Sequence, residues 1–258
     1  MYIGKYAYLG GFNGTANVLA GKLFQIDVKG THAHAYVMTY SSLADLYSTR
    51  IFSLLTREEV DFVSLVLQKR KLLNGEGAHE GELAAFISYA QAFPQGFLAL
   101  IDTYDTLVSG LHNFLAVAWA LKECGYRPLG VRLDSGDLAY LSKSIRKAFR
   151  ALDIQIATST GTSAASAICA SDGTKKERDK EMGLFENLTI VASNDINEDI
   201  LLSLNREGHE VGEHAIQFLV LSHKHYLIVY CMLYCMPLHH PIYPTYLYLF
   251  SISLSPTL

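Results

Sequence analysis

Cysteine, clustered positive charge and a targeting segment are scarce or missing in this chain of 258 residues. Its 4 cysteines do not make a disulfide framework, which leaves a reducing, cytosolic setting as the expectation. Lysine and arginine form no cluster of the kind that follows a phosphate backbone, and the formal net charge is −4, so nucleic acid is not expected as a partner. The first residues, MYIGKYAYLGGF, contain no apolar run long enough for a signal peptide.

What the chain does have is an alternation of helical and strand-like patterns. Half of its residues are apolar and 18% are charged, which is typical of a globular protein with one large domain or two small ones. The predicted helices cover residues 60–73 (after a capping-box signal at Thr56–Glu59), 81–93, 112–125 and 137–152, and the predicted strands cover 97–102, 129–134 and 188–193. Alternating strands and helices predict an α/β fold with a parallel sheet.

Polar residues follow each of the three predicted strands. They are, strand by strand, Asp102 with Thr103, Asp134 with Ser135, and Asn194 with Asp195. The carboxyl ends of parallel strands meet at one edge of a sheet and carry the chemistry in such folds, so we expect a site there. Asp137 and Asp195 are equally well explained as helix caps, whereas Asp102 and Asp134 end strands and fit a capping role less well.

Two segments differ in composition from the rest of residues 1–213, which we interpret as one incomplete domain. Residues 154–187 are small, polar and then charged, as in a solvated loop or insertion. Residues 214–258 form an apolar tail that we expect to have no evolved role. Pro237, Pro241 and Pro244 interrupt the apolar run of this tail, which argues against a membrane span. A zinc site in the tail is also disfavoured, because its CxxxC spacing is uncommon; the residues concerned are Cys231, Cys235, His239 and His240.

The stretch GTHAHAYV, residues 30–37, places His32 and His34 one residue apart. If the stretch is a strand, both rings point to the same face. A metal pair, a catalytic histidine with a bystander, and a buried structural pair are then all open. A metal-dependent barrel hydrolase would need further histidines at other strand ends, and the chain does not offer them convincingly.

Arg132 stands inside an apolar strand-like run, where an arginine is costly to bury without a partner. Two interpretations are open. Arg132 pairs with Asp134 or Asp102, or its guanidinium fork receives a carboxylate or phosphate from a ligand. The second interpretation, together with a nearby histidine, points to group transfer on an anionic small molecule.

A set of longer motifs resembles the nicotinate phosphoribosyltransferase family, and its plant form most of all. The motifs are YAYLGGFNGTANVLAG, GTHAHAYV, ELAAFISYAQAFP, LIDTYD, SGLHNFLAVAWAL, GYRPLGVRLDSGDLAYL, IRKAFRA, TIVASNDINEDIL and GHEV. They follow the family order from about Tyr6 to Val211, apart from the segment that we interpret as an insertion. The resemblance implies a partial α/β barrel of the type II phosphoribosyltransferase kind, in which parallel strands alternate with helices.

The resemblance also implies an activity and its participants. The family joins nicotinate to 5-phosphoribosyl 1-diphosphate with Mg²⁺, releasing nicotinate mononucleotide and diphosphate, as the entry of nicotinic acid into NAD synthesis. Hydrolysis of ATP is coupled through a phosphorylated histidine, which corresponds to His34; His32 lies where the family varies, and Ala35 stands where a serine is usual. The full-length family implies a homodimer. The resemblance assigns His34 to catalysis and Thr31 and Arg132 to nicotinate binding. From their places after the strands, Asp102 and Asp134 are also expected to act in catalysis, and Ser135 and Asp137 to bind substrate; no particular metal ligands are implied.

The chain departs from the family pattern at both ends of the match. The N-terminal domain of the family, with an aromatic nicotinate contact, has no counterpart before Tyr6, and the GxGT loop that holds the 5-phosphate does not follow GHEV. We therefore expect little or no phosphoribosyltransferase activity from the chain as written. Two alternatives are a non-catalytic fragment of the transferase and a metal-dependent barrel hydrolase that uses His32 and His34.

Overall fold

The computed structural model describes residues 2–12, 14–159, 183–193, 196–211, 216–220 and 229–233. The chain forms two compact units, which are described separately. The larger unit comprises Thr31–Val191 and Leu202–Glu210. The smaller unit comprises Met1–Gly30, Ala192–Leu201 and Val211–Leu258. All of the candidate site residues lie in the larger unit.

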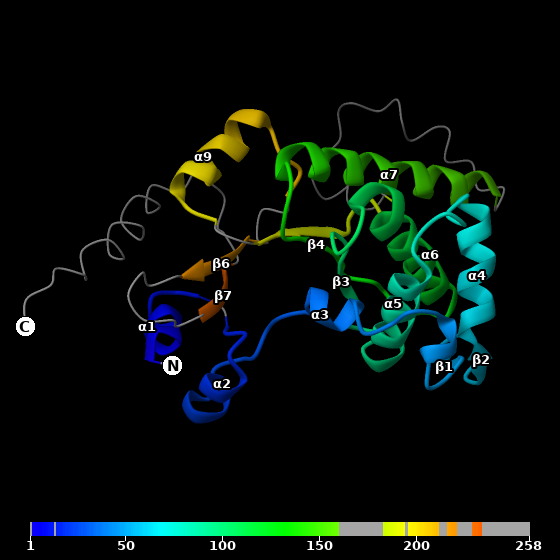
Figure 1. Cartoon of the computed structure of the whole chain (residues 1–258), viewed down its shortest axis with the longest axis horizontal. Helices are drawn as coiled ribbons and strands as arrows, with labels where there is room; N and C mark the ends of the chain where they lie inside the picture. The colour runs from blue at the N-terminus through cyan, green and yellow to red at the C-terminus, as the bar shows by residue number, and fades with distance from the viewer. Residues whose placement is uncertain are drawn as a thin grey trace, which may run out of the picture. The chain divides into compact units, whose positions relative to one another are not determined.

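The larger unit is built on neighbouring strands flanked by helices (Figure 1). Strands β3, β4 and β5 lie in that order, and β3 runs parallel to β4 with Leu100 opposite Arg132. The strands are β3 (Leu98–Leu100), β4 (Gly130–Leu133) and β5 (Thr189–Ala192), and an antiparallel hairpin is formed by β1 (Arg50–Phe52) and β2 (Glu59–Asp61). The helices are α3 (His34–Val37), the 3₁₀ turn η1 (Leu43–Asp45), α4 (Phe62–Leu72), α5 (Glu80–Ala92), the π-helical turn η2 (Thr106–Gly110), α6 (Leu111–Glu123) and α7 (Leu138–Ser159). The predicted alternation of parallel strands and helices is confirmed for β3 and β4.

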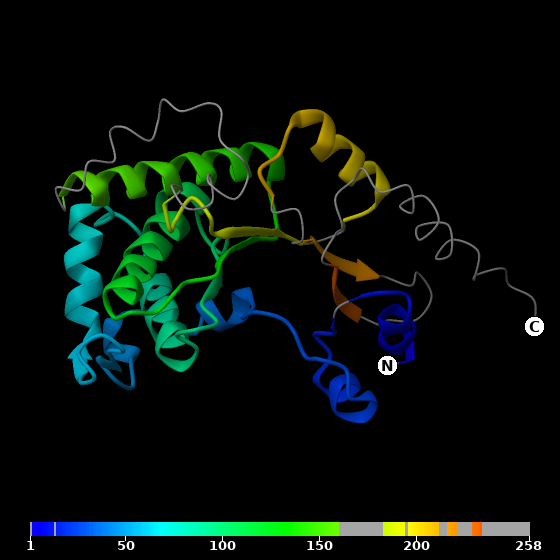
Figure 2. The same ribbon diagram turned by 180° about the vertical axis from the view of Figure 1, so that it is seen from behind.

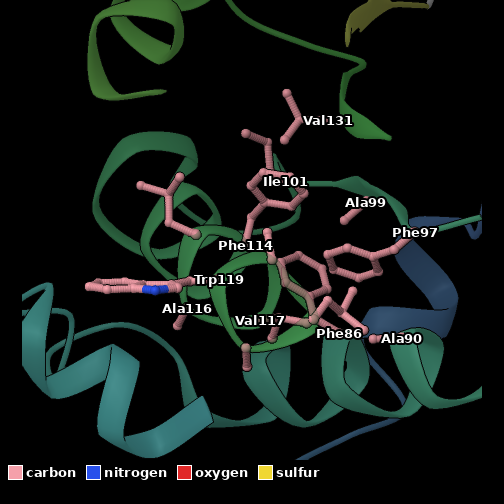
Figure 3. Packing of buried hydrophobic residues seen from close by; sticks show 14 of the residues in the cluster. Phe86, Ala90, Phe97, Ala99, Ile101, Phe114, Ala116, Val117, Trp119 and Val131 are labelled. Atoms are coloured by element: carbon pink, nitrogen blue, oxygen red, sulfur yellow. The ribbon is translucent and has the colours of Figure 1, made fainter. Parts of the chain in front are cut away.

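Helix α6 is the centre of the core of the larger unit. It packs against both α4 and α5, and α7 crosses above the three helices in both views (Figures 1 and 2). Ten of its thirteen residues are buried, which is why its sequence is apolar on nearly every side. The ring of Phe114 stacks on that of Phe97 with centroids 5.5 Å apart, and Figure 3 shows this pair beside Phe86. Each fully buried phenylalanine contributes about 1.5 to 3 kcal/mol of burial free energy.

A charged side chain also belongs to the edge of this core. Lys69 of α4 is buried, and its Nζ lies 4.9 Å from the centroid of the Trp119 ring and 2.6 Å from Glu123 Oε1. The aliphatic stem of the lysine covers apolar surface while its ammonium group keeps a carboxylate partner. This arrangement joins α4 to α6.

The smaller unit contains α1 (Tyr2–Leu9) and α2 (Val18–Phe24), the second capped by Asn17. Within it, Ala192 at the end of β5 pairs with Ile216 of β6 (Ile216–Val220), and β6 runs antiparallel to β7 (Val229–Leu233). Helix α9 (Glu198–Glu207) is divided between the two units. In the part of the chain that the structure describes, no helix is long and apolar enough to cross a membrane.

Three local predictions were wrong. Thr56 lies in the β1–β2 hairpin, and the cap of α4 is Asp61, whose carboxylate accepts a hydrogen bond from the Ser64 amide at 3.1 Å. Helix α7 runs to Ser159, so the predicted insertion at 154–187 begins later than expected. The third error concerns residues 30–37, where His34 begins a short helix instead of continuing a strand.

Other predictions fall partly or wholly outside the described residues. These include Asn194 and Asp195, the rest of the segment between Ser159 and Gly183, and the cysteine and histidine side chains of the tail. The division into a domain of residues 1–213 and a tail of residues 214–258 stays a prediction. The backbone pairing of β6 with β7 lies within that tail.

Candidate active site

The carboxyl ends of β3 and β4 bring two of the predicted carboxylates together. Asp102 follows β3 and Asp134 follows β4. Asp102 Oδ2 accepts two hydrogen bonds, from the Asp134 amide and from the hydroxyl of Ser135, both at 2.7 Å. The Asp102 side chain is only 1% exposed, whereas that of Asp134 is 28% exposed. The predicted gathering of polar groups at this edge is confirmed for these three residues.

His34 lies against both carboxylates. Its Nε2 is 3.6 Å from Asp134 Oδ2 and 4.0 Å from Asp102 Oδ1. On the other side of the ring, Nδ1 is within hydrogen-bond distance of Thr103 Oγ1, at 3.1 Å. The side chain is 37% exposed, so the ring is oriented by its neighbours and is still open to a ligand. Asp102 Oδ1 is buried and has no hydrogen-bond partner among the described residues, and it lies 4.0 Å from His34 Nε2.

The two histidines diverge because the backbone changes direction between them. Ala33 is extended, with φ −106° and ψ 166°, and it precedes the first turn of α3. His32 points inward, where its Nε2 accepts a hydrogen bond from the Leu100 amide at 3.2 Å. Its ring meets that of Tyr89 edge-on, with centroids 4.8 Å apart. His32 is therefore a packed structural residue that supports β3.

The electrostatics of His32 agree with this packing. Burial, and then the charge of Arg132, lower its pKa from 6.5 to about 4, so the ring is neutral at physiological pH. The lone pair of its Nε2 already accepts the hydrogen bond from the Leu100 amide. This contact argues against a metal ion held jointly by the Nε2 atoms of His32 and His34. Among the residues that the structure describes, no group of three or more histidine, cysteine, aspartate or glutamate side chains is arranged to hold a metal ion.

Arg132 lies on β4 and is buried, with 8% of its surface exposed. Its Nη2 donates a hydrogen bond to the carbonyl oxygen of His32 at 3.2 Å. Its charge also opposes the rise that burial causes in the pKa of Tyr89. These contacts place a fixed guanidinium group on the strand that ends at Asp134, while its role toward a ligand carboxylate stays a prediction.

The other predicted residues take different positions. Thr31 donates a hydrogen bond from its hydroxyl to the His32 carbonyl oxygen at 3.2 Å. Asp137 caps α7, since its Oδ1 accepts a hydrogen bond from the Tyr140 amide at 2.8 Å. The capping interpretation of Asp137 is thus confirmed, and its substrate-binding role stays a prediction. Thr103 was predicted only as a polar residue after a strand, with no role assigned, and its Oγ1 contacts the His34 ring.

Known proteins similar to this chain agree on one family. No family model matches the chain. Nicotinate phosphoribosyltransferase from Caenorhabditis elegans is 42% identical over 220 residues, which cover 82% of this chain and 35% of the relative. Nicotinate phosphoribosyltransferase 1 from Arabidopsis thaliana is 44% identical over 221 residues, with the same two coverages.

A solved structure is similar in fold as well as in sequence. The crystal structure of human nicotinic acid phosphoribosyltransferase matches with a TM-score of 0.65 and 38% identity, covering 83% of this chain and 39% of that one. This match confirms the predicted α/β fold of the type II phosphoribosyltransferase kind. The chain spans about 35% of the length of the relatives it matches.

Proposed function

This chain is a relative of the nicotinate phosphoribosyltransferases, and from that premise we propose that its strand-end site is the one at which these enzymes transfer a ribosyl group to nicotinate, with little or no turnover expected from the chain as written. The substrates are nicotinate and 5-phosphoribosyl 1-diphosphate, and the products are nicotinate mononucleotide and diphosphate, the first step of NAD synthesis from nicotinic acid. The observation that carries the proposal is the convergence of Asp102 and Asp134 on His34 within 4.0 Å. His34 was predicted from a motif that the family shares, and Asp102 and Asp134 were predicted from their places at strand ends.

The carboxylates suit the ribosyl transfer itself. The bond between the sugar C1 and the leaving diphosphate breaks as the pyridine nitrogen of nicotinate attacks C1, and positive charge develops on the sugar ring. A carboxylate fixed in advance stabilises such charge without having to reorganise. Asp102 fits this role, since Ser135 and the Asp134 amide hold its Oδ2, and its Oδ1 is buried without a hydrogen-bond partner among the described residues, 4.0 Å from His34 Nε2.

His34 suits acceptance of a phosphoryl group from ATP. In the tautomer that carries its proton on Nδ1 and donates it to Thr103 Oγ1, the ring has a lone pair on Nε2. Nε2 then attacks the γ-phosphorus, the bond from that phosphorus to the bridging oxygen breaks, and ADP leaves with the electron pair. The later transfer of the phosphoryl group to water returns His34 to its starting state.

Magnesium fits the donor set in a limited way. The ion takes oxygen ligands and is usually held by one or two carboxylates together with substrate phosphates, and Asp102 and Asp134 supply such carboxylates. When bound, it would neutralise charge on the departing diphosphate.

The low cysteine content supports a cytosolic setting for the protein. The family resemblance also leads us to propose that the full-length protein is a homodimer.

Arg132 is the residue that we propose binds the nicotinate carboxylate. Comparing nicotinate with nicotinamide, which lacks this carboxylate, tests the role. Breaking a desolvated charged pair costs about 2 to 5 kcal/mol. By isothermal titration, Arg132→Ala should therefore weaken nicotinate binding at least about 30-fold, and Arg132→Lys should restore part of the loss. Nicotinamide, which lacks the charge, should be much less affected. Equal weakening of nicotinate and nicotinamide binding would show that Arg132 has a structural role, through its hydrogen bond to the His32 carbonyl oxygen.

A further inference from the structure

A second cluster of polar side chains lies next to the site and has no part in the mechanism above. Its centre is Glu82 of α5, which is fully buried. Glu82 Oε2 accepts hydrogen bonds from the hydroxyl of Ser109 at 2.5 Å and from the amide of Asn113 at 3.1 Å. Ser109 belongs to η2 and Asn113 to α6, so one carboxyl group joins three helical elements. A glutamate side chain is rarely fully buried unless it is paired or hydrogen-bonded.

His79 extends the cluster toward the site. Its amide donates to Ser109 Oγ at 2.9 Å, and its carbonyl oxygen accepts from Asn113 Nδ2 at 3.0 Å. The His79 ring stacks on Tyr104, with centroids 4.0 Å apart and planes inclined by 18°. Tyr104 is the direct neighbour of Thr103, which holds the His34 ring. The contacts therefore run without interruption from Glu82 to the loop that carries Asp102, Thr103 and Tyr104.

The η2 turn supplies a second link to the same loop. Asp105 begins it, accepting hydrogen bonds from the Leu107 and Val108 amides at 3.0 and 2.7 Å. At its end, Gly110 lies so close to the strand end that an added Cβ would overlap the carbonyl oxygen of Ile101, next to Asp102. A shift of Ser109 would thus be passed on to Asp102. Single π-helical turns of this kind occur often at functional sites.

We propose that Glu82 is a positioning residue of the candidate active site, which holds the Asp102–Tyr104 loop in place through Ser109 and His79. The inference rests on the proposed function, because the loop matters through what Asp102 and Thr103 do to His34.

The charge of Glu82 is linked to the same loop. The pKa of Glu82 is raised to about 7, mainly by burial; hydrogen bonds from Ser109 and Asn113 oppose this rise, and the carboxylates of Asp102 and Asp105 add to it. His79 is the other titratable group in contact, through the hydrogen bond from the Glu82 amide to its Nδ1 at 3.2 Å. Because burial disfavours the charged carboxylate, the contribution of the protonated group to the ordered loop should be lost as the pH rises from 4.5 to about 7. Loop order should therefore depend on pH.

Amide hydrogen exchange of the purified full chain tests this role without any substrate. Glu82→Leu removes the acceptor for Ser109 and Asn113, and it should speed exchange of the amides in residues 101–110 about tenfold, because buried donors are left unpaired. Glu82→Gln keeps an acceptor oxygen and should stay near wild type. Glu76→Gln, the same change at an exposed position, is the matched control and should have no effect.

The pH dependence separates positioning from a purely structural role. After correction for the intrinsic exchange rate, wild-type protection of residues 101–110 should fall as the pH rises from 4.5 to about 7 and level off above it, and Glu82→Gln should abolish that change. If Glu82→Leu fails to fold, Ser109→Ala replaces it in the comparison. Unchanged exchange in these residues, uniform acceleration over the whole chain, or the same pH response in Glu82→Gln would overturn the proposal. Failure of the chain to bind nicotinate would count against the proposed function alone.

Discussion

Replacing His32 by phenylalanine should change how stability depends on pH. In the folded chain His32 is neutral because its pKa is lowered from 6.5 to about 4. In the unfolded chain the same ring takes up a proton below pH 6.5, so unfolding is increasingly favoured as the pH falls through the window from 6.5 to 4. The contribution of the neutral His32 ring to the free energy of unfolding is fully present above pH 6.5, where the ring is neutral in both the folded and the unfolded chain. Phenylalanine does not titrate, so this dependence should disappear.

The expected size follows from the lowered pKa and from one hydrogen bond. Lowering the pKa from 6.5 to about 4 corresponds to at most about 3 kcal/mol, of which about 2.5 kcal/mol is lost by pH 4.5. Phenylalanine keeps a ring against Tyr89 but leaves the Leu100 amide unpaired, at a cost of about 1 to 3 kcal/mol. The variant should therefore be less stable than wild type at pH 7.5 and about equally stable, or more stable, at pH 4.5.

Urea denaturation at intervals from pH 7.5 to 4.5 measures this difference, since all other titrating groups are common to both proteins. His32→Gln is the matched variant, because it keeps an acceptor for the Leu100 amide and does not titrate. It should lose less stability at pH 7.5 and show the same flattened pH dependence. A difference between wild type and His32→Phe that stays constant across the range would refute a neutral, buried His32.

Three further predictions concern single contacts of the larger unit. Asp137→Ala removes the side-chain cap of α7 and should lower the free energy of unfolding by about 1 kcal/mol in urea, with recovery in Asp137→Ser; an unchanged midpoint would contradict the capping role. Gly110→Ala should cost more than about 3 kcal/mol by the same assay, since its Cβ overlaps the Ile101 carbonyl oxygen, and near-wild-type stability would show that η2 can move. Thr103→Val should slow phosphorylation of His34 by about tenfold at unchanged stability, and Thr103→Ser should not; equal rates would rule out the ring contact as a requirement.

The regular elements around the site were predictable because their signals are local. The apolar runs that became β3 and β4, and the helical spacing of α5 and α6, each lie within a short window of sequence. Asp102 and Asp134 were found because the residue after a parallel strand has a known place in such a sheet. The proximity of the two carboxylates follows from the same topology, whereas the position of His34 beside them depends on α3.

The rest depended on contacts between residues far apart in the chain. The four residues of α3 are too few for a periodic signal, so the stretch around His34 was interpreted as a strand. The burial of His32 is set by Leu100 and Tyr89, more than fifty residues away, which no local pattern can indicate. Glu82 reads as an ordinary polar residue early in a helix, and only the packing of η2 and α6 encloses it.

Mapping the site of phosphorylation tests the proposed chemistry most directly. The full chain is incubated with γ-labelled ATP, Mg²⁺ and nicotinate, and acid-labile phosphate is located by peptide mass spectrometry. We predict label on His34, lost in His34→Ala and retained in His32→Gln, because only the His34 ring faces Asp102 and Asp134 from an exposed position. Label on another residue, or equal loss in both variants, would contradict the assignment of His34 as the phosphoryl acceptor.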